Sequence, residues 1–114
     1  LHEFLHCEGA RPAGHLAIVM RRNHDGARRR DPQTYRKDAA LLERALAVEP
    51  DAFLCTRYTF YLAQSYRDCG AHDRAIAAYL RRAELGGWDE EVYYSLYQAA
   101  RLKAALGHPA DDVI

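Results

Sequence analysis

The first chemical pattern in the chain is His2-Glu3-x-x-His6, in which two histidines stand one helical turn apart. Such a pair can bind zinc while the glutamate acts as a general base. Gly9 fits the extended form of this zinc peptidase pattern, but Pro12 stands where the third histidine ligand is required. Pro12 also interrupts any helix that would hold the two imidazoles. We therefore expect no functional metal site. Zinc hydrolysis is a remote alternative, in which His2 and His6 are the candidate ligands.

A second set of chemical groups recurs with a spacing of 34 residues. The string Phe60-Tyr61-Leu62-x-Gln64-x-x-Arg67 returns as Tyr94-Ser95-Leu96-x-Gln98-x-x-Arg101. This period is typical of tetratricopeptide repeats, in which pairs of helices stack. The first helix of each pair lines the concave face, where amide and guanidinium groups can hold a peptide backbone or a carboxylate. The alternative is that both arginines pair with neighbouring acids such as Asp68. We predict a binding surface formed by Arg57, Phe60, Tyr61, Gln64, Arg67, Tyr94, Gln98 and Arg101.

The composition limits the partners of the chain. Sixteen basic residues balance sixteen acidic ones, so no overall field attracts nucleic acid or an anionic membrane. The arginines at 21–22 and 28–30 are most simply a solvated loop, with phosphate binding as the alternative. Cys7, Cys55 and Cys69 have no metal-binding spacing and indicate reduced thiols, hence a cytoplasmic location. No stretch reaches the roughly 20 apolar residues that a membrane span needs.

Helix breakers and apolar spacing divide the chain into two parts. Residues 1–30 are predicted to be extended or irregular. The apolar run at 15–20 could pair with residues 1–7. A turn follows it, at which Gly26 is able to take positive φ. Residues 31–114 are predicted to fold as four helices, over about 32–48, 52–69, 73–85 and 89–106. Asp31 and Asp73 are the expected caps of the first and third helices, and Gly70 ends the second in the left-handed conformation. The expected fold is all-α, a right-handed superhelix of antiparallel tetratricopeptide-like hairpins.

Three strings of residues are more specific than a generic repeat. They are Asp38-x-x-Leu41-Leu42-x-x-Ala45-Leu46 with Pro50, then Arg57-Tyr58-x-Phe60-Tyr61-Leu62-Ala63-Gln64-Ser65-Tyr66, and Gly86-Gly87-Trp88-Asp89-Glu90-Glu91. Together they resemble the C-terminal region of bacterial family 2 glycosyltransferases, in which tetratricopeptide helices follow the sugar-transfer domain. The resemblance covers nearly the whole chain. It implies a fragment of a longer protein, with residues 1–30 as the tail of an upstream domain.

The resemblance also implies how the functions are divided. The upstream domain would use a nucleotide-sugar, with a divalent metal as its candidate cofactor. His2 and Glu3 are the candidate metal ligand and base at its edge. The alternative for this pair is packing between the domains. The helical part would not be catalytic and would bind a protein or acceptor, bind its parent domain, or associate subunits into a homo-oligomer. The main alternative is a free-standing adaptor that binds peptide segments.

Overall fold

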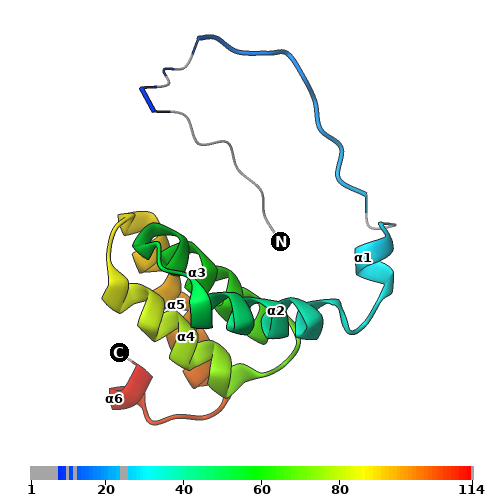
Figure 1. Ribbon diagram of the computed structural model, residues 1–114. Coiled ribbons are helices and arrows are strands. Elements are labelled where there is room, and N and C mark those ends of the chain that lie inside the picture. The colour runs from blue at the N-terminus through cyan, green and yellow to red at the C-terminus, as the bar shows by residue number, and fades with distance from the viewer. Residues whose placement is uncertain (1–7, 10, 12, 24–25, 114) are drawn as a thin grey trace. The chain divides into compact units, whose positions relative to one another are not determined.

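The computed structural model describes residues 8, 9, 11, 13–23 and 26–113, and the chain divides into two units, Leu1–Asp31 and Pro32–Ile114 (Figure 1). Every regular element in these described residues is a helix. The prediction of an all-α fold is therefore confirmed for the described part of the chain.

The N-terminal unit has little regular structure in its described residues. Residues 13–23 form neither helix nor strand, and the apolar side chains from Leu16 to Met20 that belong to the predicted extended run are 75 % to 85 % exposed. The predicted pairing with residues 1–7 lies outside the described residues. Gly26 does not use the positive φ open to a glycine: its φ is −62°, and it stands before a short helix, α1 (Ala27–Arg30), which the sequence did not predict.

The C-terminal unit contains the four predicted helices and a short fifth one. They are α2 (Thr34–Val48), α3 (Ala52–Asp68), α4 (His72–Leu85), α5 (Asp89–Ala105) and α6 (Ala110–Val113).

Two of the helices begin differently from the prediction. Helix α2 begins at Thr34 with Gln33 at its N-cap position, two residues later than the sequence predicted. Helix α4 has Ala71 at that position, and Asp73 lies in the first turn, where its charge still favours the positive end of the helix dipole. Helix α3 is capped by a side chain: Asp51 accepts a hydrogen bond of 3.0 Å from the backbone N–H of Leu54.

The ends of α3 and α5 share one geometry. Gly70 and Gly107 both have positive φ, at 84° and 77°. The residue after each glycine donates its N–H to a carbonyl five positions earlier, from Ala71 to Tyr66 at 2.8 Å and from His108 to Lys103 at 3.0 Å. These are the bonds of a Schellman motif, which ends a helix and turns the chain back. The left-handed conformation predicted for Gly70 is confirmed.

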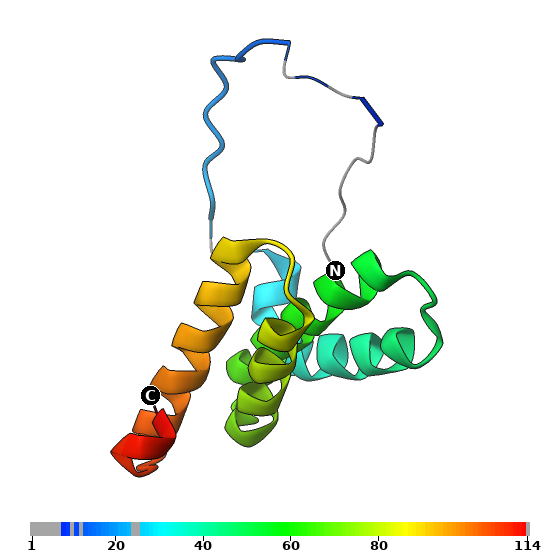
Figure 2. The ribbon, with the colours of Figure 1, turned by 90° about the vertical axis from the view of Figure 1, so that its left-hand side faces the viewer.

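Consecutive helices of the C-terminal unit pack against each other. Helix α2 contacts α3, α3 contacts α4, and α4 contacts α5 (Figure 2). The central contact is close because Ala63 of α3 and Ala75 of α4 are small and have no exposed surface. Around them lies a core that also contains Ile76, Tyr79, Ala99 and Leu102, while Ala39, Leu42 and Leu62 form a second core between α2 and α3.

Candidate functional site

Helices α3 and α5 meet through residue pairs that are 34 positions apart. Arg57 of α3 donates to the Glu91 carboxylate of α5 at 2.9 Å. The rings of Phe60 and Tyr94 meet edge to face with centroids 5.9 Å apart. Both pairs connect positions that are equivalent in the sequence repeat, so α3 and α5 run in the same direction and in register. We call the surface that they form, together with the α4–α5 turn, the α3–α5 face.

One pocket on this face is mainly aromatic. It has a volume of about 210 Å³ and lies between α3 and the start of α5. Rings from both helices and from the turn give it apolar contact area, and the amide of Gln64 offers donors and an acceptor for a polypeptide backbone. We call it the aromatic pocket. Its lining residues are Phe60, Gln64, Trp88, Glu90, Glu91 and Tyr94.

A second pocket adjoins the aromatic pocket and shares Trp88 and Glu91 with it. Its volume is about 390 Å³. Two arginines line it, and it extends from the first turns of α3 to the α4–α5 turn. We call it the arginine pocket. Its lining residues are Phe53, Thr56, Arg57, Arg82, Leu85, Gly86, Gly87, Trp88 and Glu91.

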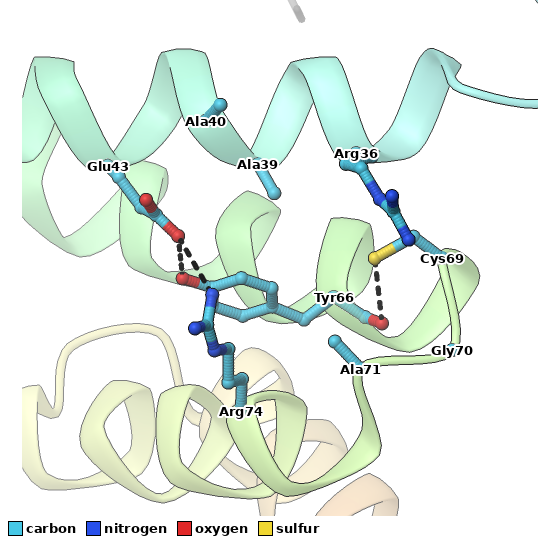
Figure 3. A pocket seen from close by; sticks show the side chains of 9 residues that line it. All are labelled: Arg36, Ala39, Ala40, Glu43, Tyr66, Cys69, Gly70, Ala71 and Arg74. Carbon is cyan, nitrogen blue, oxygen red and sulfur yellow. Dashed lines mark hydrogen bonds and ion pairs between the residues drawn. The ribbon is translucent and has the colours of Figure 1, made fainter.

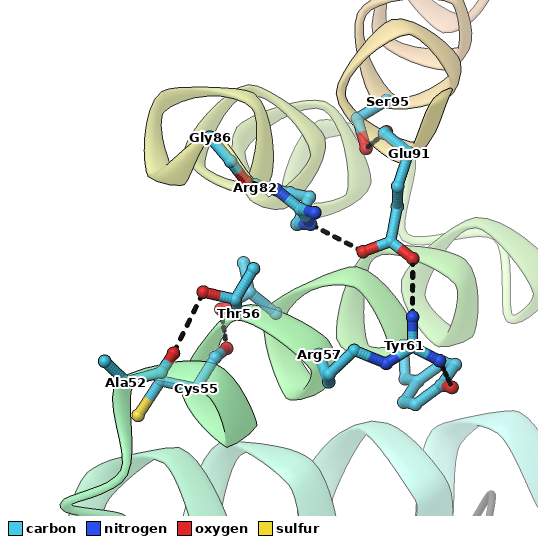
Figure 4. A network of polar contacts seen from close by, with 10 residues as sticks. Ala52, Cys55, Thr56, Arg57, Tyr61, Arg82, Gly86, Glu91 and Ser95 are labelled. Carbon is cyan, nitrogen blue, oxygen red and sulfur yellow. Dashed lines mark hydrogen bonds and ion pairs between the residues drawn. The ribbon is translucent and has the colours of Figure 1, made fainter. Parts of the chain in front are cut away.

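A buried ion-pair network forms the base of the arginine pocket (Figure 4). The Glu91 carboxylate accepts from Arg82 Nε at 2.6 Å through one oxygen and from Arg57 through the other. Arg82 also donates to the Gly86 carbonyl at 2.6 Å, and Arg57 donates to the Tyr61 hydroxyl. Arg82 is only 1 % exposed and Glu91 5 %. The Glu91 carboxylate of α5 therefore joins α3, through Arg57, to α4, through Arg82.

The backbone of the α4–α5 turn positions this network. Gly86 has φ 67° and ψ −152°, a conformation that side chains other than hydrogen essentially forbid. Gly87 follows with φ 92°. The turn brings the Gly86 carbonyl onto the Arg82 guanidinium and leaves Trp88 59 % exposed beside both pockets.

The structure places the eight predicted binding residues in three kinds of position. Phe60, Gln64 and Tyr94 line the aromatic pocket, and Arg57 lines the arginine pocket. Tyr61 lies under the Arg57 guanidinium, 5.1 Å from the ring centroid. The remaining three, which are Arg67, Gln98 and Arg101, line neither pocket.

Those three residues have other surroundings. Arg67 donates to Asp68 at 2.8 Å and to the Tyr94 hydroxyl at 3.1 Å, and the bond to Asp68 raises the pKa of Arg67. For Arg67, this is the pairing with Asp68 that the sequence offered as the alternative to ligand binding. Gln98 is buried at 5 % exposure, while Arg101 is exposed and stands over the ring of Tyr97 at 5.7 Å. The predicted binding residues therefore do not form a single row of equivalent side chains.

Sequence reasoning did not select Arg82, Trp88 or Glu91 as binding residues. A signal for Arg82 was present, because it falls three residues after Tyr79 on the apolar face of its helix. A signal for Glu91 was also present, because it follows Arg57 by the repeat period. Trp88 carried no periodic signal, since it lies in the turn between helices.

A third pocket lies away from this face, between α2 and α3 and the start of α4 (Figure 3). It has a volume of about 400 Å³ and contains Arg36, Glu43, Tyr66 and Arg74. The Tyr66 hydroxyl donates to the Glu43 carboxylate, and burial together with this carboxylate raises the pKa of Tyr66 to about 12. Glu43 also forms an ion pair with Arg74 at 3.9 Å.

Two further results concern metals and membranes. The candidate metal or catalytic residues His2, Glu3 and His6 lie outside the described residues. Among the residues that the structure does describe, no three histidine, cysteine, aspartate or glutamate side chains are grouped so as to hold a metal ion. Within the same part of the chain, no helix has the length and apolar character needed to cross a membrane.

Comparison with known proteins finds no relative of this chain. No protein-family model, curated protein or solved structure matches this chain.

Proposed function

We propose that the C-terminal unit is a tetratricopeptide-like module that binds an extended polypeptide segment on the α3–α5 face. The observation that carries this proposal is the in-register contact of α3 with α5, Arg57 with Glu91 and Phe60 with Tyr94, at a spacing of 34 residues. This spacing is the period of repeats whose first helices lie side by side. Stacks of that kind form extended surfaces that hold other molecules.

The chemistry of the face supports a polypeptide as the ligand. The aromatic pocket offers ring faces and edges for one side chain, and the adjoining arginine pocket offers charge. Trp88 is the kind of large, partly exposed residue that commonly contributes most to a binding interface. Gln64 can pair with both the N–H and the carbonyl of a peptide group. Neither pocket offers an arrangement of nucleophile and base, so we propose binding without catalysis.

The parent protein in this proposal is a bacterial family 2 glycosyltransferase, and its support is the resemblance in residues 38–50, 57–66 and 86–91. The helical unit would then hold an acceptor, a protein or another subunit while an upstream domain transfers sugar. Sequencing the coding region before Leu1 tests this part. A nucleotide-sugar domain there supports it, and a stop or an unrelated domain favours a free-standing adaptor.

A peptide-display selection on the whole chain tests the binding surface. Enriched peptides should bind a Trp88→Ala variant at least about tenfold more weakly than they bind the unmodified chain. The reason is that truncation of a hot-spot residue commonly costs about 2 kcal/mol or more of binding free energy. Tyr93→Ala is the matched control: Tyr93 is 71 % exposed on α5 and lines neither pocket. Equal binding by both variants would show that the α3–α5 face is not the site.

A further inference from the structure

The ion-pair network under the arginine pocket has more positive than negative charge. Two guanidinium groups, of Arg57 and Arg82, share the single carboxylate of Glu91. Arg82 is 1 % exposed, and the Arg57 side chain is 25 % exposed. Arginine stays protonated in proteins, so the excess charge cannot be relieved by loss of a proton. A charge held away from water is unfavourable unless an opposite charge approaches it.

The arginine pocket gives a ligand access to this excess charge. Both arginines line it, and Glu91 is the one acidic residue among its lining residues. The apolar side chains of Phe53, Leu85 and Trp88 form other parts of its wall. Such walls exclude water and strengthen an ion pair formed beside them. Charge complementarity therefore favours an anionic group of the ligand in this pocket.

The aromatic pocket next to it has no cationic lining residue. Its charged lining residues are Glu90 and Glu91, of which Glu91 is already bound by both arginines, and Phe60, Trp88 and Tyr94 supply its apolar surface. It therefore offers no partner to a carboxylate and suits an apolar side chain. The two pockets share Trp88 and Glu91, so they are adjacent. In an extended polypeptide, residues i and i+2 point to the same side about 6.6 Å apart, which suits two neighbouring pockets.

We propose that the ligand is an acidic polypeptide segment in which an aspartate or glutamate lies two residues from an apolar residue. Its carboxylate binds at the arginine pocket beside Arg57 and Arg82, and its apolar side chain occupies the aromatic pocket beside Phe60 and Trp88. This inference rests on the proposed function and adds the class of sequence that the α3–α5 face selects.

The chain contains its own reporter for this test. Trp88 is the only tryptophan in the sequence, and it lines both pockets. Its fluorescence should change in a saturable way when either pocket fills. The probe is the peptide Ser-Leu-Ser-Glu-Ser, acetylated at its N-terminus and amidated at its C-terminus, so that the glutamate carries its only carboxylate. The reference peptide has glutamine in place of glutamate and is otherwise identical.

Two protein variants assign any preference to the arginine pocket. Arg57→Gln removes the more exposed of the two arginines and should leave the unit folded, which circular dichroism checks. Arg81→Gln is the matched control, because it removes the same charge from an exposed residue that pairs with Glu84 and lines neither pocket. A third peptide, with glutamine and a free C-terminus, tests a terminal carboxylate as the source of the anion.

The expected result is a glutamate peptide that binds about tenfold or more tightly than the glutamine peptide, as expected for a charged hydrogen bond. This preference should disappear in Arg57→Gln and persist in Arg81→Gln. Equal saturable binding of the two blocked peptides, with the same change in Trp88 fluorescence, would overturn acid recognition and leave the binding face intact. A free-terminus peptide as tight as the glutamate peptide would overturn the side-chain assignment. No saturable response from any peptide in this series would overturn the proposal.

Discussion

Glu91 neutralises charge inside the helical unit, and replacing it with glutamine should destabilise the fold strongly. Its carboxylate binds Arg82 at 2.6 Å and Arg57 at 2.9 Å. Glutamine keeps the length of the side chain and one acceptor oxygen but removes the charge. Arg82, with 1 % exposure, would then remain buried with neutral acceptors such as the Gly86 carbonyl, and no carboxylate would balance its charge.

The size of the effect follows from the burial of the two arginines. Removing one partner of a buried ion pair commonly costs about 3–5 kcal/mol, because an uncompensated charge stays in the interior. Arg57 can recover part of this through water, since its side chain is 25 % exposed. We therefore expect the lower end, about 3 kcal/mol. For a domain of this size that corresponds to a fall in melting temperature of more than about 10 °C.

Urea unfolding followed by far-ultraviolet circular dichroism measures this change. The control is Glu90→Gln, which removes the same charge from the exposed preceding residue and should change the free energy of unfolding by no more than about 0.5 kcal/mol. A double-mutant cycle with Arg82→Met should show that the cost of Glu91→Gln shrinks once Arg82 is absent. If Glu91→Gln and Glu90→Gln unfold at the same midpoint, the argument from the buried network is refuted.

The remaining predictions concern glycine and tyrosine. Gly86→Asn should lower the free energy of unfolding by about 1–3 kcal/mol, because only glycine tolerates φ 67° with ψ −152°. Gly70→Asn should lower it by less, since asparagine accepts the left-handed conformation of a Schellman motif. Equal losses in the two variants would contradict this prediction. Tyr79→Phe should raise the free energy of unfolding by about 1 kcal/mol or more, because the buried Tyr79 hydroxyl has no partner among the described residues. Tyr66→Phe should lower the free energy of unfolding by about 0.5–1.5 kcal/mol through loss of the bond to Glu43. A lower stability of Tyr79→Phe would contradict the prediction for that residue. Burial raises the pKa of both Tyr66 and Tyr79 to about 12 from 10.0 in the unfolded chain, so their contribution to stability is complete below pH 10 and is lost as the pH rises to about 12. Absorbance titration should show both ionising after the exposed tyrosines, and a single transition near pH 10 would exclude the shift.

The helices could be predicted from sequence because their signals are local. Apolar residues at helical spacing lie between breakers at Pro50, Gly70 and Gly86, and the four longer helices, α2 to α5, follow that pattern. The errors are local too. Asp31 and Asp73 each offered a capping carboxylate, but α2 begins after Gln33 and α4 after Ala71. A capping residue indicates that a helix begins nearby, and it fixes the first residue less well.

The candidate site was harder to predict because its members depend on tertiary contacts. The spacing places Arg82 on the apolar face of its helix, but it does not identify the groups that bind a buried guanidinium there, which are Glu91 of α5 and the Gly86 carbonyl beyond the end of α4. The charge of an arginine alone does not say whether it will face solvent. The two short helices α1 and α6 were missed for another reason, since four residues are too few to show a helical period.

The sequence repeat and the binding surface are related in an indirect way. Positions that repeat with the same chemistry are mainly used for packing: Phe60 meets Tyr94 edge to face, and Gln98 is buried. Arg57 and Glu91 occupy equivalent positions but carry opposite charges, so they bind each other rather than forming a row of like groups. The aromatic pocket is lined by the repeated positions Phe60, Gln64 and Tyr94 and by Trp88 in the turn, whereas the arginine pocket lies beside the unlike pair of Arg57 and Glu91. The charge selection proposed for the helical unit therefore depends on positions where the repeat departs from identity, while the repeated positions hold α3 and α5 in register and supply apolar binding surface.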